Sequence, residues 1–385
     1  MSLLPTVRDL WRALAVGAVI AVILGGGSLA FSAANEAARG PAPDYLFNDS
    51  HFHLTNYVQK GTDIHKYVGQ IMGDKVGRST LFGIPLQQLW SYANSGDFAP
   101  TYYLQSDAPL YYYSFTDAYI ARVYQALPKE QQARLDPMIT GFNPTDMYGV
   151  DHIRRVLEVF PGIFSGIGEF SIHKEFVSSK VAGETASLTN PALDRILDFA
   201  GEVGLAVIMH NDIDMPFAKA GTEPVYLRQM KDLLRRHPNT TIIWAHLGLG
   251  RIVHPVQGQA TEDSAERSSA YQEIVEQLVN DLTLSHVYYD ISWDEVAKYA
   301  IASPEAVRRT VAAFNSHPDR FLFGTDNVAP ADQATQLRVF HLWDPIWAQL
   351  TPEASLKIRK GNYERIFDAA RAKVRAWEKA NVKPL

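Results

Sequence analysis

The residues of this chain best suited to chemistry are four histidines and two carboxylates, each at the end of an apolar run. They are His51, His53, Glu169, His210, His246 and Asp326. Because the chain contains no cysteine, thiolate zinc sites, disulfides and cysteine nucleophiles are excluded. Imidazole and carboxylate groups together form a ligand set for zinc and similar divalent ions. These residue types therefore predict a divalent-metal site.

The tightest spacing within this set is the His-Phe-His segment at residues 51–53. Residues two apart on a β-strand point to the same side, so both imidazoles can reach one ion. A single histidine at the end of an apolar strand is more often a hydrogen-bonded structural residue. The chain has only 12 histidines, and four of them at matching positions favour the metal site over that alternative.

Eight short apolar runs could place these residues. They lie at 45–47, 80–84, 137–140, 164–167, 205–209, 241–245, 287–291 and 321–323. Runs without polar alternation are typical of strands buried on both faces. Helical patterns lie between them, for example after the Asn190-Pro191 and Ser303-Pro304 start signals.

Alternating strands and helices predict a parallel sheet. Eight such units close into a (β/α)8 TIM barrel, of the metal-dependent hydrolase type, with its active site at the carboxyl ends of the strands. An open doubly wound sheet is the alternative, but no G-x-G-x-x-G segment follows the first run.

The first 34 residues carry a separate signal. Arg8 and Arg12 precede an apolar run at 13–24, which is followed by glycines and small residues. This pattern predicts a secretory signal peptide, with an uncleaved N-terminal membrane anchor as the alternative. We therefore expect export to the periplasm or beyond, or anchoring to the cytoplasmic membrane. Residues 35–385 are predicted to form one barrel with an aromatic insert at about 87–114 and a C-terminal helical tail.

Four segments carry a family resemblance. They are HFH at 51–53, WAHLG at 244–248, LFGTD at 322–326 and GNYERIF at 361–367. Together with the order of histidines and carboxylates, they resemble the amidohydrolase superfamily, in particular its amidohydrolase-related (amidohydrolase 2) family. The resemblance covers most of the chain from Asn48 to Phe367, and it says little about the substrate.

The resemblance implies a divalent-metal hydrolase in which His51, His53, His210 and Asp326 hold the metal. His246 is then either a ligand of a second ion or a catalytic imidazole. We expect Zn²⁺, with Mn²⁺ as the alternative, and one or two ions.

One position departs from part of the superfamily. Members with a carbamylated-lysine metal bridge carry lysine at the end of strand four, where this chain has Glu169. Lys174 follows five residues later, in the expected loop, so no carbamate bridge is predicted. A glutamate at this position resembles the TatD-like nucleases, in which such a residue can ligate a metal pair.

The ligand set suggests a mechanism. A divalent ion can lower the pKa of water from 15.7 to about 7. Asp326 would accept the proton and pass it to the leaving group, and His246 would polarise the scissile carbonyl. We expect hydrolysis of a C–N or C–O bond in an amide, ester or lactone. The alternatives are a metal-dependent decarboxylase of the same family, a TatD-like nuclease and an inactive exported binding barrel.

Substrate contacts are expected from loops that follow the strands. The candidates are Lys174, Arg251, His254 and Trp293. Arg251 could clamp a carboxylate, and a surface salt bridge is the alternative. The predicted insert contains six tyrosines, at 92, 102, 103 and 111–113. We expect most of them to pack the insert onto the barrel, although a lid or substrate wall is the other interpretation.

Charge limits the class of partner. The formal net charge of −6 argues against nucleic acid as the main ligand, since such proteins are usually basic. We therefore expect a small-molecule substrate. Membrane contact is expected only through an uncleaved N-terminal segment, and a homo-oligomer stays open.

Overall fold

The computed structural model describes residues 44–215, 224–250 and 262–383. Eight parallel strands form its central sheet, in the order in which they occur along the chain. They are β1 (Phe47–Asp49), β3 (Val76–Leu81), β6 (Leu135–Ile139), β7 (Gly166–Ser171), β8 (Ala206–His210), β9 (Ile242–Trp244), β10 (Val287–Asp290) and β11 (Phe321–Leu322). The Ser50 N–H donates to the Phe323 carbonyl at 3.0 Å and joins the first strand to the last. The fold is a (β/α)8 TIM barrel, as predicted.

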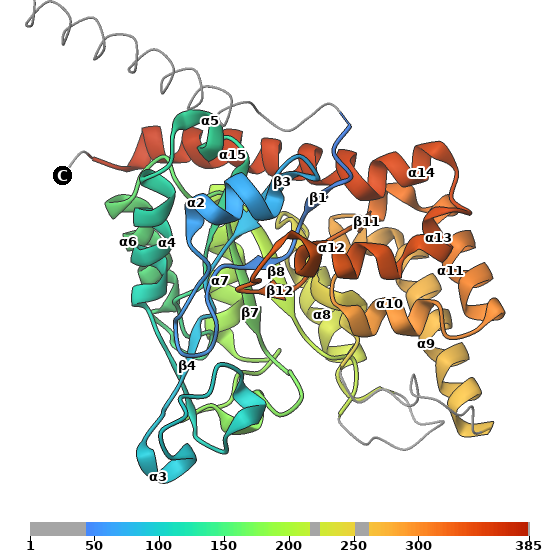
Figure 1. Ribbon diagram of the computed structural model, residues 1–385, viewed down its shortest axis with the longest axis horizontal. Helices are drawn as coiled ribbons and strands as arrows, with labels where there is room; N and C mark the ends of the chain where they lie inside the picture. Colours follow the sequence, from blue (N-terminus) through green and yellow to red (C-terminus); the bar gives the residue numbers. More distant parts are fainter. Residues whose placement is uncertain (1–43, 216–223, 251–261, 384–385) are drawn as a thin grey trace, which may run out of the picture.

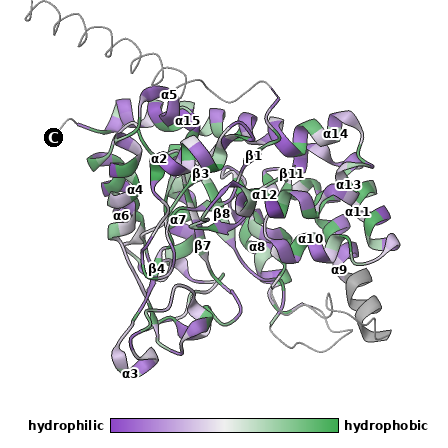
Figure 2. Cartoon of the chain, in the orientation of Figure 1, coloured by the Kyte–Doolittle hydropathy of each residue, from purple (hydrophilic) through white to green (hydrophobic). Residues whose placement is uncertain are grey.

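Helices surround this barrel (Figure 1). They are α2 (Ile64–Lys66) with the π-helix η1 (Tyr67–Met72), α4 (Phe115–Gln125), α5 (Lys129–Gln132), α6 (Gly149–Val159), α7 (Pro191–Val203), α8 (Leu227–Arg236), α9 (Glu262–Asn280), α10 (Asp294–Ala300) and α11 (Pro304–Ser316). Short 3-10 turns are η3 (Ser178–Lys180), η4 (Ala245–Gly248), η5 (Leu282–Leu284) and η6 (Pro318–Arg320). Most of these helices carry both hydrophobic and hydrophilic residues, as expected when one face packs on a sheet (Figure 2).

Two of the helices begin where their sequences predict. Asn190 caps α7, because its side chain accepts a hydrogen bond from the Ala192 N–H and Pro191 occupies the first turn. Ser303 caps α11 in the same way, through the Ala306 N–H. These side chains satisfy backbone donors that have no partner inside the helix.

Several strands begin or end a few residues away from the apolar runs. β3 starts at Val76 and β6 at Leu135, and both include polar side chains that an apolar pattern leaves out. Ser79 in β3 bonds the Tyr67 hydroxyl at 2.8 Å, and Asp136 in β6 accepts from Arg78 at 2.9 Å. Since each polar group has a buried partner, it is tolerated inside the sheet.

An insert interrupts the connection between β3 and α4. It contains β4 (Leu86–Gln88), α3 (Tyr92–Ser95), η2 (Tyr103–Gln105) and β5 (Leu110–Tyr112), and β4 pairs with β5 in an antiparallel hairpin. A second small sheet pairs β2 (Phe52–His53) with β12 (Asn327–Val328) beside the end of the barrel.

The C-terminal segment is helical, and its last helix covers the end of the barrel opposite the insert (Figure 1). It comprises α12 (Gln333–Leu342), α13 (Asp344–Trp347), α14 (Pro352–Leu356), η7 (Lys357–Gly361) and α15 (Asn362–Asn381). Tyr363 and Phe367 of α15 pack against Met138, Ile208 and Leu322 from the strands. In Figure 1, α15 lies on one side of the barrel and the insert with α3 projects from the other.

The predicted signal peptide or anchor at residues 1–34 lies outside the described residues. Among the residues that are described, no helix is both long enough and apolar enough to cross a membrane.

Candidate metal centre

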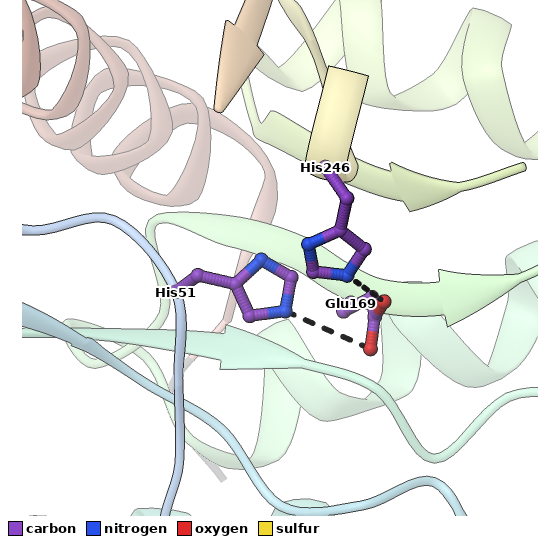
Figure 3. A group of neighbouring side chains, drawn as sticks. All are labelled: His51, Glu169 and His246. Atoms are coloured by element: carbon purple, nitrogen blue, oxygen red, sulfur yellow. Dashed lines mark ion pairs between the residues drawn. The ribbon is translucent and has the colours of Figure 1, made fainter. Parts of the chain in front are cut away.

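The six predicted ligand residues converge at one end of the barrel. His51 and His53 follow β1, Glu169 lies in β7, His210 ends β8, His246 follows β9 and Asp326 follows β11. The side chains of His51 and His246 point at the Glu169 carboxylate (Figure 3). Their Nε2 atoms lie 3.7 Å and 3.4 Å from its two oxygens. Residues separated by up to 275 positions therefore meet because the barrel closes.

Asp290 at the end of β10 sets the orientation of the His51 ring. Nδ1–H of His51 donates to Asp290 Oδ2 at 2.8 Å, and both side chains are fully buried. In the neutral ring this contact puts the proton on Nδ1 and the lone pair on Nε2, which faces the cluster. Asp290 Oδ1 also accepts from the His246 N–H at 3.0 Å. Asp290 was not among the predicted residues, although a carboxylate inside an apolar run was the signal that could have found it.

The imidazoles of His246 and His210 each have a partner outside the cluster. Nδ1 of His246 lies 2.8 Å from Ser292 Oγ, which leaves its Nε2 directed toward Glu169. His210 lies between two carboxylates, with Nδ1 2.8 Å from Glu169 Oε1 and Nε2 2.9 Å from Asp212 Oδ1. Such outer partners hold metal-binding imidazoles in position. The sequence did not predict Asp212 or Ser292.

His53 and Asp326 form the more exposed side of the cluster. Nε2 of His53 lies 3.1 Å from Asp326 Oδ1 and 3.4 Å from Glu169 Oε2. Nε2 of His51 lies 3.5 Å from the same Asp326 oxygen. The Lys174 ammonium is 3.5 Å from Glu169 Oε1, and it comes from the loop after β7, as predicted. One positive side chain thus accompanies the carboxylates.

The pKa values of the two central histidines diverge. Burial lowers the pKa of His51, but the carboxylates of Asp290 and Glu169 outweigh that effect and hold it well above 6.5, so a bound divalent ion would take the place of the proton on Nε2. Burial also lowers the pKa of His246, and there the nearby carboxylates do not compensate. His246 is therefore neutral at neutral pH and keeps a lone pair for a cation or a hydrogen bond.

The two central carboxylates remain ionised. Burial raises the pKa of Glu169, but Lys174 and the surrounding imidazoles outweigh it, so the pKa lies well below its usual range. The pKa of Asp326 is also below its usual range, because His246 and His53 outweigh burial. Both groups therefore present negative charge to the centre of the cluster.

The cluster fits a divalent ion. His51 Nε2 and His246 Nε2 are buried without a hydrogen-bond partner in the part of the chain that is described. Donor atoms of His51, Glu169 and His246 lie within 4.8 Å of one another, as do those of His51, His53 and Asp326. Buried lone pairs without a partner are costly, and a cation satisfies them. Two overlapping groups that share His51 are compatible with one ion or two.

The backbone at three strand ends adopts unusual conformations. His246, Trp293 and Asp326 have φ values of 56°, 78° and 54°, in the left-handed region that non-glycine residues rarely occupy. Such conformations cluster at functional sites, where the surrounding structure enforces them. Each of the three residues was predicted to act in catalysis or binding.

A cavity of about 320 Å³ opens above the cluster. His53, His210, His246 and Asp326 form its floor. Lys174 and Trp293, two of the predicted substrate contacts, line its sides. The other two, Arg251 and His254, lie outside the described residues. Arg338 of α12 also lines the cavity, and the sequence did not predict it.

The insert forms one wall of this cavity. Tyr57, Tyr102 and Tyr103 line it, and the rings of Tyr57 and Tyr103 are in edge contact at 5.0 Å. Lys180 fastens the wall, since its ammonium donates to the carbonyls of Tyr103 at 2.7 Å and Ser106 at 2.6 Å. Both interpretations of the tyrosines therefore apply, because Tyr103 packs the insert and also lines the cavity. Tyr92 does neither and is 73% exposed.

Comparison with known proteins gives the family. Residues 49–369 match the sequence model of the family described as Amidohydrolase. The match spans most of the chain, so the chain belongs to the amidohydrolase family and is an enzyme of the metal-dependent hydrolase class. No match is found among curated proteins.

Solved structures of low sequence identity resemble the chain, and the first of the following three supports the fold. An amidohydrolase from Burkholderia multivorans with bound zinc is 12% identical, with a TM-score of 0.52, covering 84% of this chain and 99% of that one. A dihydroorotase from Campylobacter jejuni is 12% identical, with a TM-score of 0.45 and coverages of 84% and 83%. Amidohydrolase 2 from Bifidobacterium longum subsp. infantis is 14% identical, with a TM-score of 0.45 and coverages of 84% and 98%.

Proposed function

We propose that the chain hydrolyses a C–N or C–O bond of a small amide, ester or lactone with the help of one or two divalent ions. The observation that carries this proposal is the pair of buried, unpartnered nitrogens, His51 Nε2 and His246 Nε2, beside the Glu169 carboxylate. Zinc is the ion we propose, because imidazoles dominate the donor set.

The ligands we propose are the six converging side chains. His51, His53, His210 and Asp326 would hold the first ion, with Glu169 at its side, and His246 would serve a second ion if two bind. When bound, a divalent ion supplies Lewis acidity, which polarises a carbonyl and makes water easier to ionise.

Asp326 is the base in this proposal. It is ionised and lies at the cavity floor beside the proposed ion, so it would accept a proton from water and return it to the leaving group. If one ion binds, the neutral imidazole of His246 would polarise the substrate carbonyl. Lys174 and Trp293 line the cavity beside these groups and would contact the substrate.

The test uses the full chain in detergent, stripped with chelator and reloaded with Zn²⁺ or Mn²⁺. Metal content is measured by mass spectrometry, and turnover is assayed on amides, esters and lactones. We expect at least one metal equivalent per chain and metal-dependent turnover. Asp326→Asn should lower kcat by roughly 10²–10⁴-fold, which is the usual contribution of a general base. His51→Ala should lose both metal and turnover.

His65→Ala on α2 is the matched control, because His65 is an exposed histidine that does not belong to the buried cluster. It should keep metal content and rate. Less than one metal equivalent per chain, or full turnover by Asp326→Asn, would contradict the proposal. Phosphoesters and aromatic carboxylic acids belong in the assay panel, since their turnover would indicate a nuclease or a decarboxylase instead.

A further inference from the structure

One cation that lines the cavity, Arg338, is exposed and comes from α12, outside the buried metal-ligand cluster. Thr335, Arg338 and Val339 line the cavity, and their three- and four-residue spacing puts them on one face of α12. Gln336 and Phe340 occupy the buried face of the same helix. The register of α12 therefore directs Arg338 to the cavity, while its exposed position places it at the opening.

Two acidic side chains that share the cavity or helix α12 with Arg338 already have partners. Asp294, which lines the same cavity, forms an ion pair with Lys298 at 2.8 Å. Asp332 accepts from both the N–H and the hydroxyl of Thr335 at 2.8 Å. Arg338 itself makes no hydrogen bond or ion pair with any residue in the described ranges. Its guanidinium is thus available to a molecule inside the cavity.

The space between Arg338 and the floor suits one small ring. Its walls include the aromatic side chains of Tyr57, Tyr102 and Trp293, together with Ile84 and Val328. A volume of about 320 Å³ lies at the lower end of the roughly 300–1,000 Å³ typical of ligand pockets, as expected for a small ligand. The remaining lining is mostly polar, so the cavity combines a few aromatic and aliphatic side chains with charged and hydrogen-bonding groups.

We propose that Arg338 binds a carboxylate of the substrate at the end remote from the metal-ligand cluster. A guanidinium pairs with a carboxylate through two parallel hydrogen bonds, which fixes orientation as well as charge. The reacting carbonyl then faces Asp326 and His246 while the carboxylate stays at the opening. This inference rests on the proposed hydrolase function, and it makes the carboxylate a recognition group rather than the group that is removed.

The test measures binding, so that it does not depend on turnover. Benzoate and benzamide have nearly the same shape and differ in charge, and their affinities for the full zinc-loaded chain are compared by calorimetry. We expect benzoate to bind at least about tenfold more tightly, as for a hydrogen bond between charged groups. Arg338→Met should remove that preference without weakening benzamide, and Arg338→Lys should restore part of it.

One control variant and two further measurements identify the group that binds the anion and the kind of anion it prefers. Arg308→Met is the matched control, because Arg308 is exposed on α11 and pairs with Glu305. It should bind both probes like the parent chain. In the metal-stripped chain the preference for benzoate should persist. Phenyl phosphate in place of benzoate tests for a phosphate site, and its tighter binding would overturn the choice of carboxylate.

Other outcomes also contradict the proposal. A benzoate preference that survives Arg338→Met and disappears with the metal would place the carboxylate on the ion. Equal binding of the two probes, or no binding of benzoate, would also overturn it. The proposed hydrolase function would survive each of these results if a neutral ester were still cleaved in a metal-dependent and Asp326-dependent way. Loss of that cleavage with the benzoate preference intact would overturn the function and leave the anion site.

Discussion

The ring orientation of His51 depends on one buried carboxylate. Asp290 accepts the Nδ1 proton of His51 and the backbone N–H of His246, so it fixes two members of the cluster at once. An imidazole that donates from one nitrogen presents the lone pair of the other. Asp290 is therefore a positioning residue for metal binding and does not contact the cavity.

This role leads to a prediction about metal affinity. Asp290→Asn keeps the shape of the side chain but loses the charge that holds the His51 Nδ1 proton. We expect the dissociation constant for Zn²⁺ to rise by roughly 10–100-fold, the usual cost of losing an outer-shell partner. Competition with a chromophoric chelator measures it.

Asp294→Asn is the matched control, since Asp294 lines the same cavity but pairs with Lys298 instead of a histidine of the cluster. Its Zn²⁺ affinity should match that of the parent chain. An Asp290→Asn chain with unchanged affinity would show that ring orientation is fixed by packing alone.

At the residue level, the sequence indicated ligand types but not their supporting groups. His51, His210 and His246 stand out because a polar residue ends an apolar run. Asp290 stands inside such a run and is concealed by its apolar neighbours. Arg338 lies in a helix after the last strand, where nothing in the pattern distinguishes it from a solvated surface arginine.

At the level of elements, strand order was predictable and strand bounds were not. The eight apolar runs each correspond to a strand, because residues buried on both faces must be apolar. β7 continues to Ser171, however, two residues beyond Glu169, at which the predicted strand ends. Pairing with β8 decides that extension, since Phe170 and Ser171 are matched with Met209 and His210. A single run cannot show how far its neighbour extends.

The wall formed by the insert could not be predicted from the insert alone. Tyr57, Tyr103 and Val177 come from three separate loops and share one small hydrophobic cluster beside the cavity. Lys180, from the loop after β7, joins this cluster to the barrel through backbone carbonyls of the insert. Six tyrosines in one segment are compatible with either packing or ligand binding. The loops that they contact decide between these roles, and the sequence of the segment does not show those contacts.

The junction of α8 and β10 supplies a prediction for pH. His286 Nε2–H donates to the Leu234 carbonyl at 2.9 Å, and burial lowers the pKa of His286 below 6.5. Because the folded pKa lies below the unfolded one, this stabilisation is complete above pH 6.5 and is lost as pH falls through the folded pKa. His286→Gln keeps a donor and cannot titrate.

We therefore expect the free energy of unfolding of the parent chain to fall more steeply than that of His286→Gln between about pH 7.5 and pH 5. Urea titrations at several pH values measure the slopes. His341→Gln, at an exposed histidine of α12, controls for the loss of one imidazole. Identical slopes in the parent chain and His286→Gln would refute the assignment.

At the level of the whole molecule, α15 completes the barrel core. Phe367 is fully buried, its ring lies 4.5 Å from that of Tyr363, and both contact the strands from the end opposite the cavity. Asp136 in β6 adds polar contacts, because it accepts from the Tyr363 hydroxyl at 2.7 Å and from Arg371 at 2.5 Å. The C-terminal helix is thus part of the barrel's stability.

Removing one large side chain from this interface should be costly. Phe367→Ala is expected to lower the free energy of unfolding by about 3–5 kcal/mol, the usual cost of deleting a buried phenylalanine. Urea denaturation followed by tryptophan fluorescence measures the change. Leu356→Ala in α14, where the side chain is 60% exposed, should change it by less than about 0.5 kcal/mol. Equal effects of the two substitutions would exclude a core role for α15.

Closure of the barrel is what assembled the cluster from separate strands. No spacing rule relates His51 to Asp326, yet Nε2 of one lies 3.5 Å from a carboxylate oxygen of the other. A predicted barrel of eight strands implied that His51 and Asp326 would come together, but the distance between them follows only from the closed sheet.

In the part of the chain that is described, side chains of α15 fill the end of the barrel opposite the cavity. In the proposed function, substrate and product would therefore both pass through the cavity beside Arg338. A product that remains bound in this cavity would prevent the next substrate from binding, so the two would compete. In the proposed function, the rate of product release from the cavity would therefore limit how quickly the next catalytic turnover can begin.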